Sequence, residues 1–502
     1  KKMGSGRSTN DDLTTMLQIL IKKNDTMPSV IPTIIDQKLE KAIFDLNNAY
    51  YDFIKASGDD AMNSIASRLK GKMGRFRKNQ MGKRVRGMCR STIIGDPRIL
   101  IGEVGVPLTF ARIIQYEETV QEYNKANLLK YVQNGRRYYP GATKVIKHNT
   151  GTEYDIDSAR DIDLEIGDKV LRDMIDGDLV NFNRQPSLNG SSIGTHNAKI
   201  ILDPSIKTIT MNVIVCAMYN ADFDGDQMNL IISAGVETRN ELELSKVANW
   251  LISHTSSNPS IGQTDDSVIG CAELTRSGVL FDKYHASLLF VNTTFLPSFD
   301  NFPSEGMSGR DCISLLLADT PLNFTRMAQW YDPHMAAHIA YDPDEIRVKI
   351  DRGRLVSGIL DKKSIGKGAN GGVYHVIANE YGCEKALEVI FNMQQAAIAY
   401  ILQFGYSIGI MDLIIPDAAK KEIDGIAADI INNSRLITEE LHNGEIIPPI
   451  GKTVEEFYEE RQINTLSIFE DFTEPILKAI NTRTNNLFKL IQFGSKGKID
   501  NM

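Results

Sequence analysis

The residues from Asn220 to Asn229 read NADFDGDQMN. Three aspartates alternate within this segment, at Asp222, Asp224 and Asp226, and Gly225 separates the last two. Side chains two positions apart in an extended segment lie on one face, and a glycine lets the backbone bend so that the carboxylates converge. Anions this close repel one another unless a hard divalent cation with oxygen ligands binds them. The segment therefore predicts a Mg²⁺ site formed by carboxylates, waters and a substrate phosphate.

Two other phosphate- or cation-binding motifs can be tested by counting positions. An EF-hand loop starting at Asp222 requires Gly at its sixth position and Glu at its twelfth, where the chain has Gln227 and Ser233. A Walker A loop ending at Gly451–Thr453 requires an upstream glycine, where the chain has Ile446. Both motifs are therefore excluded at these positions.

A solvent-exposed turn is the structural alternative for the three aspartates, because Asp and Gly both favour turns. A turn explains the glycine, but it does not explain the apolar run from Met228 to Ile232 that follows directly. On the upstream side, apolar residues alternate with mostly polar ones at Ile209, Met211, Val213 and Val215. We therefore expect a half-buried strand over 208–215 that leads to the aspartates.

The composition narrows the class of protein. The chain has 502 residues, of which 42% are hydrophobic and 24% charged, as in a globular protein of several domains. The apolar stretch from Ala386 to Leu402 is interrupted by polar residues, among them Asn392, Gln394 and Gln395, so we expect no membrane span. The five cysteines are scattered without a C-x-x-C pair, which argues against zinc or a disulfide framework in this segment.

The net charge of the chain is −8, and this value taken alone argues against a nucleic-acid-binding protein. One segment of the chain is nevertheless strongly basic. From Arg68 to Arg90 there are ten Lys or Arg residues and no Asp or Glu, with glycines interspersed. Such a block repels itself unless it meets a polyanion or an acidic partner. A solvated or protein-binding surface is the alternative to phosphate binding. The nucleic-acid-binding candidates are Lys70, Lys72, Arg75, Arg77, Lys83, Arg84 and Arg90.

The pattern of apolar residues also changes along the chain. It is helical up to about residue 70, and short apolar runs between turn residues indicate strands over 91–232. A mixed region follows over 236–382, and the remainder is mostly helical, with a long acidic-faced helix expected at 454–469.

Upstream of the aspartates, Arg184 lies just before a turn at Pro186. Its planar guanidinium could bind hydroxyl or phosphate oxygens, or it could have only a structural role.

Taken together, these blocks resemble the largest subunit of multisubunit DNA-dependent RNA polymerases. The segment at Asn220–Met228 is similar to the signature of that family, and FNRQPSL at Phe182–Leu188 to the block before it. Further similar blocks follow the order of the family: GRFRKNQMGKRV at 74–85, GDPRI to VGVP at 95–107, SGILDKKSIG at 357–366, GYSIGIMD at 405–412 and GSKGKIDNM at 494–502.

The resemblance implies an α+β multidomain fold with a double-psi β-barrel as its catalytic core and helical clamp-core, pore and funnel regions. The domains implied are the C-terminal part of the clamp core at 1–67, the switch region with the barrel at 68–235, the pore domain at 236–383 and the helical funnel at 384–502. In the family, clamp zinc sites precede this region and the bridge helix and trigger loop follow it. We therefore expect a central fragment or one piece of a split subunit.

The resemblance also implies a function, DNA-templated addition of ribonucleoside triphosphates to the RNA 3′ end with release of pyrophosphate. Asp222, Asp224 and Asp226 would hold one Mg²⁺, and a second would arrive with the nucleotide. Arg184 and Asn220 match positions that contact ribose hydroxyls, and Lys496 matches a position near the triphosphate. The basic block would bind the template strand and the RNA–DNA hybrid.

The implied partners are the second-largest and smaller polymerase subunits, template DNA, RNA and nucleotides, without a membrane. Gln227 stands where cellular eukaryotic enzymes usually have Glu, and Asn189 where His is common. These departures favour a viral enzyme. The implied location is intracellular: a cytoplasmic viral factory or the virion if viral, the nucleus if cellular. A Mg²⁺-dependent nuclease or phosphohydrolase, or a non-catalytic nucleic-acid-binding scaffold, stays an alternative.

Overall fold

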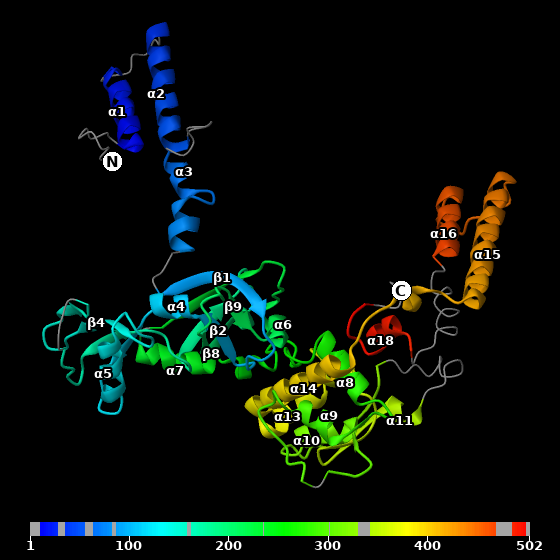
Figure 1. Cartoon of the computed structure of the whole chain (residues 1–502). Helices are drawn as coiled ribbons and strands as arrows, with labels where there is room; N and C mark the ends of the chain where they lie inside the picture. Colours follow the sequence, from blue (N-terminus) through cyan, green and yellow to red (C-terminus); the bar gives the residue numbers. More distant parts are fainter. Residues whose placement is uncertain are drawn as a thin grey trace. The chain divides into compact units, whose positions relative to one another are not determined.

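The structure is a computed structural model, and it describes residues 11–28, 36–55, 64–82, 87–157, 162–233, 235–300, 302–329, 342–467 and 484–497. The chain divides into two compact units, 1–86 and 87–502 (Figure 1). Each unit has its own internal packing.

The first unit is helical in its described part, as the apolar spacing predicts. Its helices are α1 (Asp12–Asp25), α2 (Gln37–Lys55) and α3 (Ile65–Leu69). The α1 and α2 helices pack side by side, and Lys23 Nζ lies 2.8 Å from an oxygen of Asp45 across them (Figure 1). A short π-helix over Phe76–Gln80 lies within the basic block.

The second unit contains a closed barrel of six strands in the order β1-β10-β7-β8-β2-β9. Parallel pairs join β1 to β9 and β2 to β8, and the other pairs are antiparallel. Apolar side chains such as Val106, Phe182 and Leu230 fill its interior without solvent exposure. The strands are β1 (Met88–Gly95), β2 (Glu103–Pro107), β7 (Leu179–Asn183), β8 (Ile193–Ile201), β9 (Ile209–Met211) and β10 (Gln227–Ile232).

The expectation of a strand over 208–215 is wrong for the second half of that segment. β9 ends at Met211, and a 3₁₀-helix over Val213–Val215 continues into α6 (Cys216–Tyr219). The Asn212 side chain accepts a hydrogen bond from the Ile214 backbone N–H at 3.0 Å and so caps this helical segment. Asparagine offers the backbone this local alternative to strand pairing, which the alternation of apolar residues does not reveal.

A second sheet of four strands, in the order β3-β6-β4-β5, lies between β2 and β7 in sequence, together with two helices. Its own small core includes Val120, Leu128, Val145 and Val170. The elements are α4 (Leu108–Ile113), β3 (Tyr116–Thr119), α5 (Lys125–Asn134), β4 (Ala142–Ile146), β5 (Glu153–Asp155) and β6 (Lys169–Arg172).

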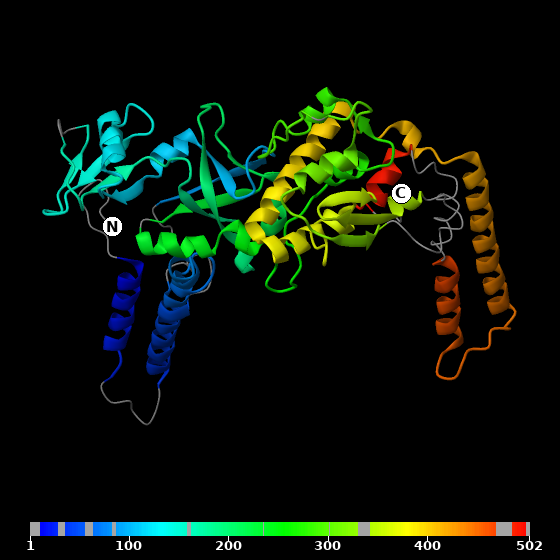
Figure 2. The same cartoon turned by 90° about the horizontal axis from the view of Figure 1, so that it is seen from below.

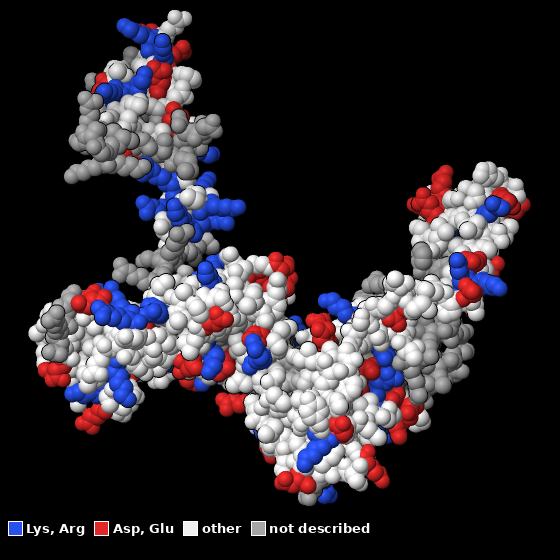
Figure 3. Space-filling model, viewed as in Figure 1, with Lys and Arg blue, Asp and Glu red and all other residues white. Residues whose placement is uncertain are grey.

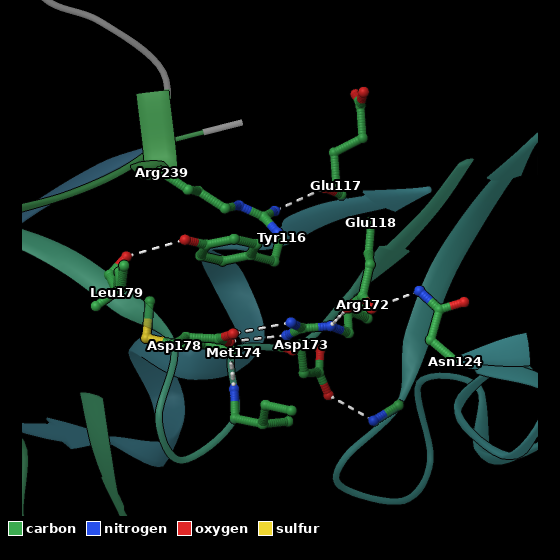
Figure 4. A network of polar contacts seen from close by, with 12 residues as sticks. Tyr116, Glu117, Glu118, Asn124, Arg172, Asp173, Met174, Asp178, Leu179 and Arg239 are labelled. Carbon is green, nitrogen blue, oxygen red and sulfur yellow. Dashed lines mark hydrogen bonds and ion pairs between the residues drawn. The ribbon is translucent and has the colours of Figure 1, made fainter. Parts of the chain in front are cut away.

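A buried arginine joins this sheet to the start of β7 (Figure 4). The Arg172 side chain is 5% exposed, and its two Nη atoms each lie 2.8 Å from an oxygen of Asp178, while its Nε contacts Glu118. Beside it, Arg239 of α7 (Val236–Leu244) lies 4.1 Å from the ring centroid of Tyr116. Since a buried charge needs its partners, this network fixes the orientation of the strand that leads to Arg184.

The remainder of the second unit packs around two helices, α8 (Asp266–Leu274) and α14 (Cys383–Phe404). A hairpin of α15 (Asp417–His442) and α16 (Val454–Leu466) follows, with Arg461 contacting Glu440 across it (Figure 2). None of the described helices has both the length and the apolar character needed to span a membrane. The other elements are β11 (Leu280–Phe281), α9 (Lys283–Leu288), β12 (Met307–Ser308), α10 (Gly309–Leu316), β13 (Phe324–Met327), α11 (Pro343–Ile346), β14 (Arg347–Asp351), β15 (Arg354–Ser357), α12 (Lys362–Ile365), α13 (Val373–Tyr381) and α18 (Asn486–Gln492).

Candidate active site

The three aspartates converge on the loop that joins α6 to β10. One carboxylate oxygen from each of Asp222, Asp224 and Asp226 lies within 4.8 Å of the other two. Gly225 has a φ of 122°, a backbone conformation that L side chains rarely adopt, and it turns the chain between the last two aspartates. Asp222 and Asp224 are exposed and Asp226 is half-buried, so the cluster faces solvent.

This arrangement suits Mg²⁺. The ion binds oxygen ligands octahedrally at about 2.0–2.1 Å, which places neighbouring ligand oxygens about 3 Å apart. The oxygens of the triad lie within 4.8 Å of one another, and side-chain rotation of the exposed Asp222 and Asp224 would be needed to bring them to that distance. All three donors are hard carboxylate oxygens, and no thiol or imidazole belongs to this cluster.

The aspartates differ in their electrostatics. The pKa of Asp222 is raised, first because it shares a hydrogen bond with Asp224 and further because both neighbouring carboxylates repel its charge. The pKa of Asp226 is lowered, chiefly because Arg184 donates a hydrogen bond to it. The mutual repulsion at Asp222 is the cost that a bound cation would remove.

Arg184 stands next to the triad at the end of β7. Its Nε donates to Asp226 Oδ2 at 2.8 Å, and the two side chains are 20% and 24% exposed. The pairing of β7 with β10, in register at Asn183 and Asn229, brings the two chain segments together. The family resemblance implies that Arg184 contacts the ribose, and this role stays a prediction. Its ion pair with Asp226 was not anticipated, because the two residues are 42 positions apart.

Asn220 begins the aspartate loop in a left-handed conformation, with φ 50° and ψ 43°, as the C-cap of α6. Asparagine tolerates this conformation better than most residues do. Its side chain is exposed and has no hydrogen-bond partner within the described residues. The amide is therefore open to a ligand, and its predicted role at the ribose stays a prediction.

Among the described residues of its unit, Arg90 is the member of the basic block that lies at the site. Located on β1, its Nε donates to Gln227 Oε1 at 3.1 Å and its Nη1 to Gln185 Oε1 at 3.0 Å. Both acceptors are neutral, so these contacts orient the guanidinium without neutralising its charge. Lys496 is instead 80% exposed and lies 4.0 Å from Asp265, and among the described residues no contact joins it to the triad.

The remainder of the block belongs to the first unit. Figure 3 shows lysine and arginine side chains gathered over α3 and the residues that follow it. Lys70, Lys72, Arg75 and Arg77 are exposed there, whereas Lys83 and Arg84 lie outside the described residues. The exposure suits a surface that meets phosphates, and that role stays a prediction.

Comparison with known proteins gives the family. Residues 82–247 match the family model described as RNA polymerase Rpb1, domain 2, and residues 250–413 match RNA polymerase Rpb1, domain 3. A DNA-directed RNA polymerase RPB1 homolog of African swine fever virus is 38% identical over 100% of this chain and 37% of its own length.

Cellular relatives match over the same extent. The DNA-directed RNA polymerase subunit Rpo1N of Thermococcus celer is 32% identical over 99% of this chain and 59% of its own length. The DNA-directed RNA polymerase II subunit RPB1-B of Trypanosoma brucei brucei is 32% identical over 98% of this chain and 28% of its own length. The chain thus spans 28% to 59% of the length of these three curated relatives. The chain belongs to the Rpb1 family of largest subunits of DNA-directed RNA polymerases.

Proposed function

We propose that this chain provides the catalytic centre of a DNA-directed RNA polymerase, which adds ribonucleoside triphosphates to the 3′ end of a templated RNA. The observation that carries the proposal is the convergence of three carboxylates within 4.8 Å on a loop of a closed six-stranded barrel. Membership of the Rpb1 family supports it. We infer that the barrel is of the double-psi type, and its mixture of parallel and antiparallel pairs agrees with that topology.

In this mechanism Asp222, Asp224 and Asp226 would hold the resident cation. Bound there, Mg²⁺ would favour ionisation of the RNA 3′-hydroxyl and offset the charge that develops on the α-phosphate, with a second ion entering with the nucleotide. Arg184 donates to Asp226 Oδ2, so Asp226 Oδ1 would be the oxygen open to a metal. The free amide of Asn220 suits recognition of a ribose hydroxyl, because a site built to hydrogen-bond a hydroxyl rejects the substrate that lacks it.

The other parts of the chain have proposed roles in the assembled enzyme. We assign 1–67 to the clamp core, 68–235 to the switch region and barrel, 236–383 to the pore and 384–502 to the funnel. The basic block, with Arg90, would bind DNA and the RNA–DNA hybrid through phosphates, and Lys496 would approach the triphosphate. The proposed partners are the second-largest and smaller polymerase subunits. The proposed location is a viral factory or virion for a viral source, or the nucleus for a cellular one.

The test is RNA extension by the assembled polymerase on a primed DNA–RNA scaffold. Asp224→Asn keeps the size of the side chain but removes a charged ligand, and we expect extension to fall by at least a hundredfold. Asp429→Asn is the matched control, because Asp429 is an exposed aspartate in the middle of α15. Extension by the Asp224 variant at the rate of the control would refute the proposal, and hydrolysis of nucleic acid by the chain alone would favour a phosphohydrolase.

A further inference from the structure

Three buried amide side chains lie on the mainly apolar helix α14. Asn392, Gln394 and Gln395 are 3%, 2% and 3% exposed. Burying an amide is unfavourable unless a hydrogen bond compensates for the lost water. Asn392 bonds to Thr294, but Gln394 and Gln395 reach the barrel, where Gln395 Nε2 donates to the Pro97 carbonyl.

The partner of Gln394 is Asn212, which is fully buried. Asn212 Nδ2 donates to Gln394 Oε1 and to the Ile99 carbonyl, both at 2.9 Å, with a weaker contact of 3.3 Å to the Pro97 carbonyl. Its Oδ1 accepts from the Ile214 N–H at 3.0 Å. Both the nitrogen and the oxygen of this amide are therefore hydrogen-bonded.

Asn212 also caps the helical segment that leads into the aspartate loop. The helical segment that it caps runs without interruption from Val213 to Tyr219, and Asn220 and the triad follow directly. The loop is mostly exposed. Arg184 bonds to Asp226, and the Ile93 N–H donates to the Asp226 carbonyl at 3.1 Å. Ala221 packs against the barrel core. At its N-terminal end the loop continues the capped segment, so the position of the carboxylates also depends on where that segment is held.

We propose that Asn212 and Gln394 are positioning residues for the aspartate triad, so that α14 fixes the place of the carboxylates through a buried amide pair. This inference rests on the proposed function, in which the triad binds a divalent cation. Ile214, Val215 and Tyr219 are buried in the barrel core and do not depend on the amide pair for a hydrogen-bond partner of their side chains. Loss of the pair consequently displaces the segment without unfolding it.

The test measures Mn²⁺ binding to the assembled polymerase by electron paramagnetic resonance, without nucleotide or template. Gln394→Met keeps most of the volume but removes the acceptor, and Asn212→Ala removes the cap as well. We expect the Mn²⁺ dissociation constant to rise about fivefold in each variant, the effect of about one lost buried hydrogen bond. The double variant should show less than the product of the two effects, because both act through one contact.

Gln263→Met is the matched control. Gln263 is an equally buried amide that donates to Tyr374 and to the Ile390 carbonyl of α14, but it has no contact with Asn212. It should lower the melting temperature as Gln394→Met does and leave Mn²⁺ affinity unchanged. Unchanged affinity in both Gln394→Met and Asn212→Ala would overturn the proposal, as would an equal loss in the control. If Asp224→Asn binds Mn²⁺ as the wild type does, the proposed metal site itself is wrong.

Discussion

Replacing Gly225 with alanine changes the backbone conformation that the aspartate loop prefers and leaves its three carboxylates unchanged. An added Cβ at this position meets no atom within 4 Å, so the substitution causes no clash. The φ of 122° is nevertheless a conformation that only glycine adopts readily. All three carboxylates are retained, and the perturbation is therefore confined to the backbone between Asp224 and Asp226.

The expected magnitude follows from that strain. Holding a non-glycine residue in such a region costs about 1–3 kcal/mol. If the loop relaxes instead, the conformation that brings the carboxylates within 4.8 Å becomes a minor state. The apparent dissociation constant for a divalent cation rises in proportion, about 5- to 150-fold. Mn²⁺ titration of the assembled polymerase followed by electron paramagnetic resonance measures this change.

Gly278→Ala is the matched control, because Gly278 also has a positive φ, of 82°, and no atom within 4 Å of an added Cβ. It should cause a similar backbone strain outside the aspartate loop. We expect both variants to melt within a few degrees of each other, and only Gly225→Ala to lose Mn²⁺ affinity. Wild-type affinity in Gly225→Ala would refute the view that this glycine makes the carboxylates converge.

Three further predictions concern the site and the basic block. Asn220→Gly keeps the left-handed backbone but removes the amide, so the preference for ribo- over deoxyribonucleotides should fall by about 1–3 kcal/mol in single-nucleotide incorporation; an unchanged ratio would exclude Asn220 from the sugar site. Arg77→Gln should weaken scaffold binding equally for unrelated sequences and reduce the log–log salt slope by nearly one unit, and a sequence-dependent loss would indicate another partner. Because the pKa of Asp222 is raised, Mn²⁺ affinity should be full well above that pKa and fall as pH decreases through it, whereas Asp222→Asn should flatten this dependence in calorimetric titrations.

The spacing of apolar residues predicts the secondary structure of several segments correctly. The apolar spacing predicts α1 and α2, and the alternation before the triad predicts β9. The same alternation is wrong beyond Met211, because the side chain of Asn212 caps a helix there. Apolar periodicity carries no information on such a hydrogen bond, since the residues that follow are apolar in either structure.

In the candidate site too, the contacts between neighbouring residues can be predicted from the sequence, and those between distant segments cannot. The spacing of the three aspartates predicts their convergence, because they are local in sequence. The pair between Arg184 and Asp226 depends on the register of β7 with β10, which no local pattern encodes. The contact between Asn212 and Gln394 spans 182 positions. The amides that interrupt an otherwise apolar helix are the one signal for it, because a buried amide requires a partner.

We propose that Asp222, Asp224 and Asp226 together hold the resident cation of a polymerase. The most direct measurement is an anomalous-difference map from crystals of the assembled enzyme grown in Mn²⁺. We expect one strong peak about 2.0–2.2 Å from a carboxylate oxygen of each aspartate, with Arg184 still bonded to Asp226. A resident ion bound elsewhere, with the three carboxylates turned to solvent, would contradict the account.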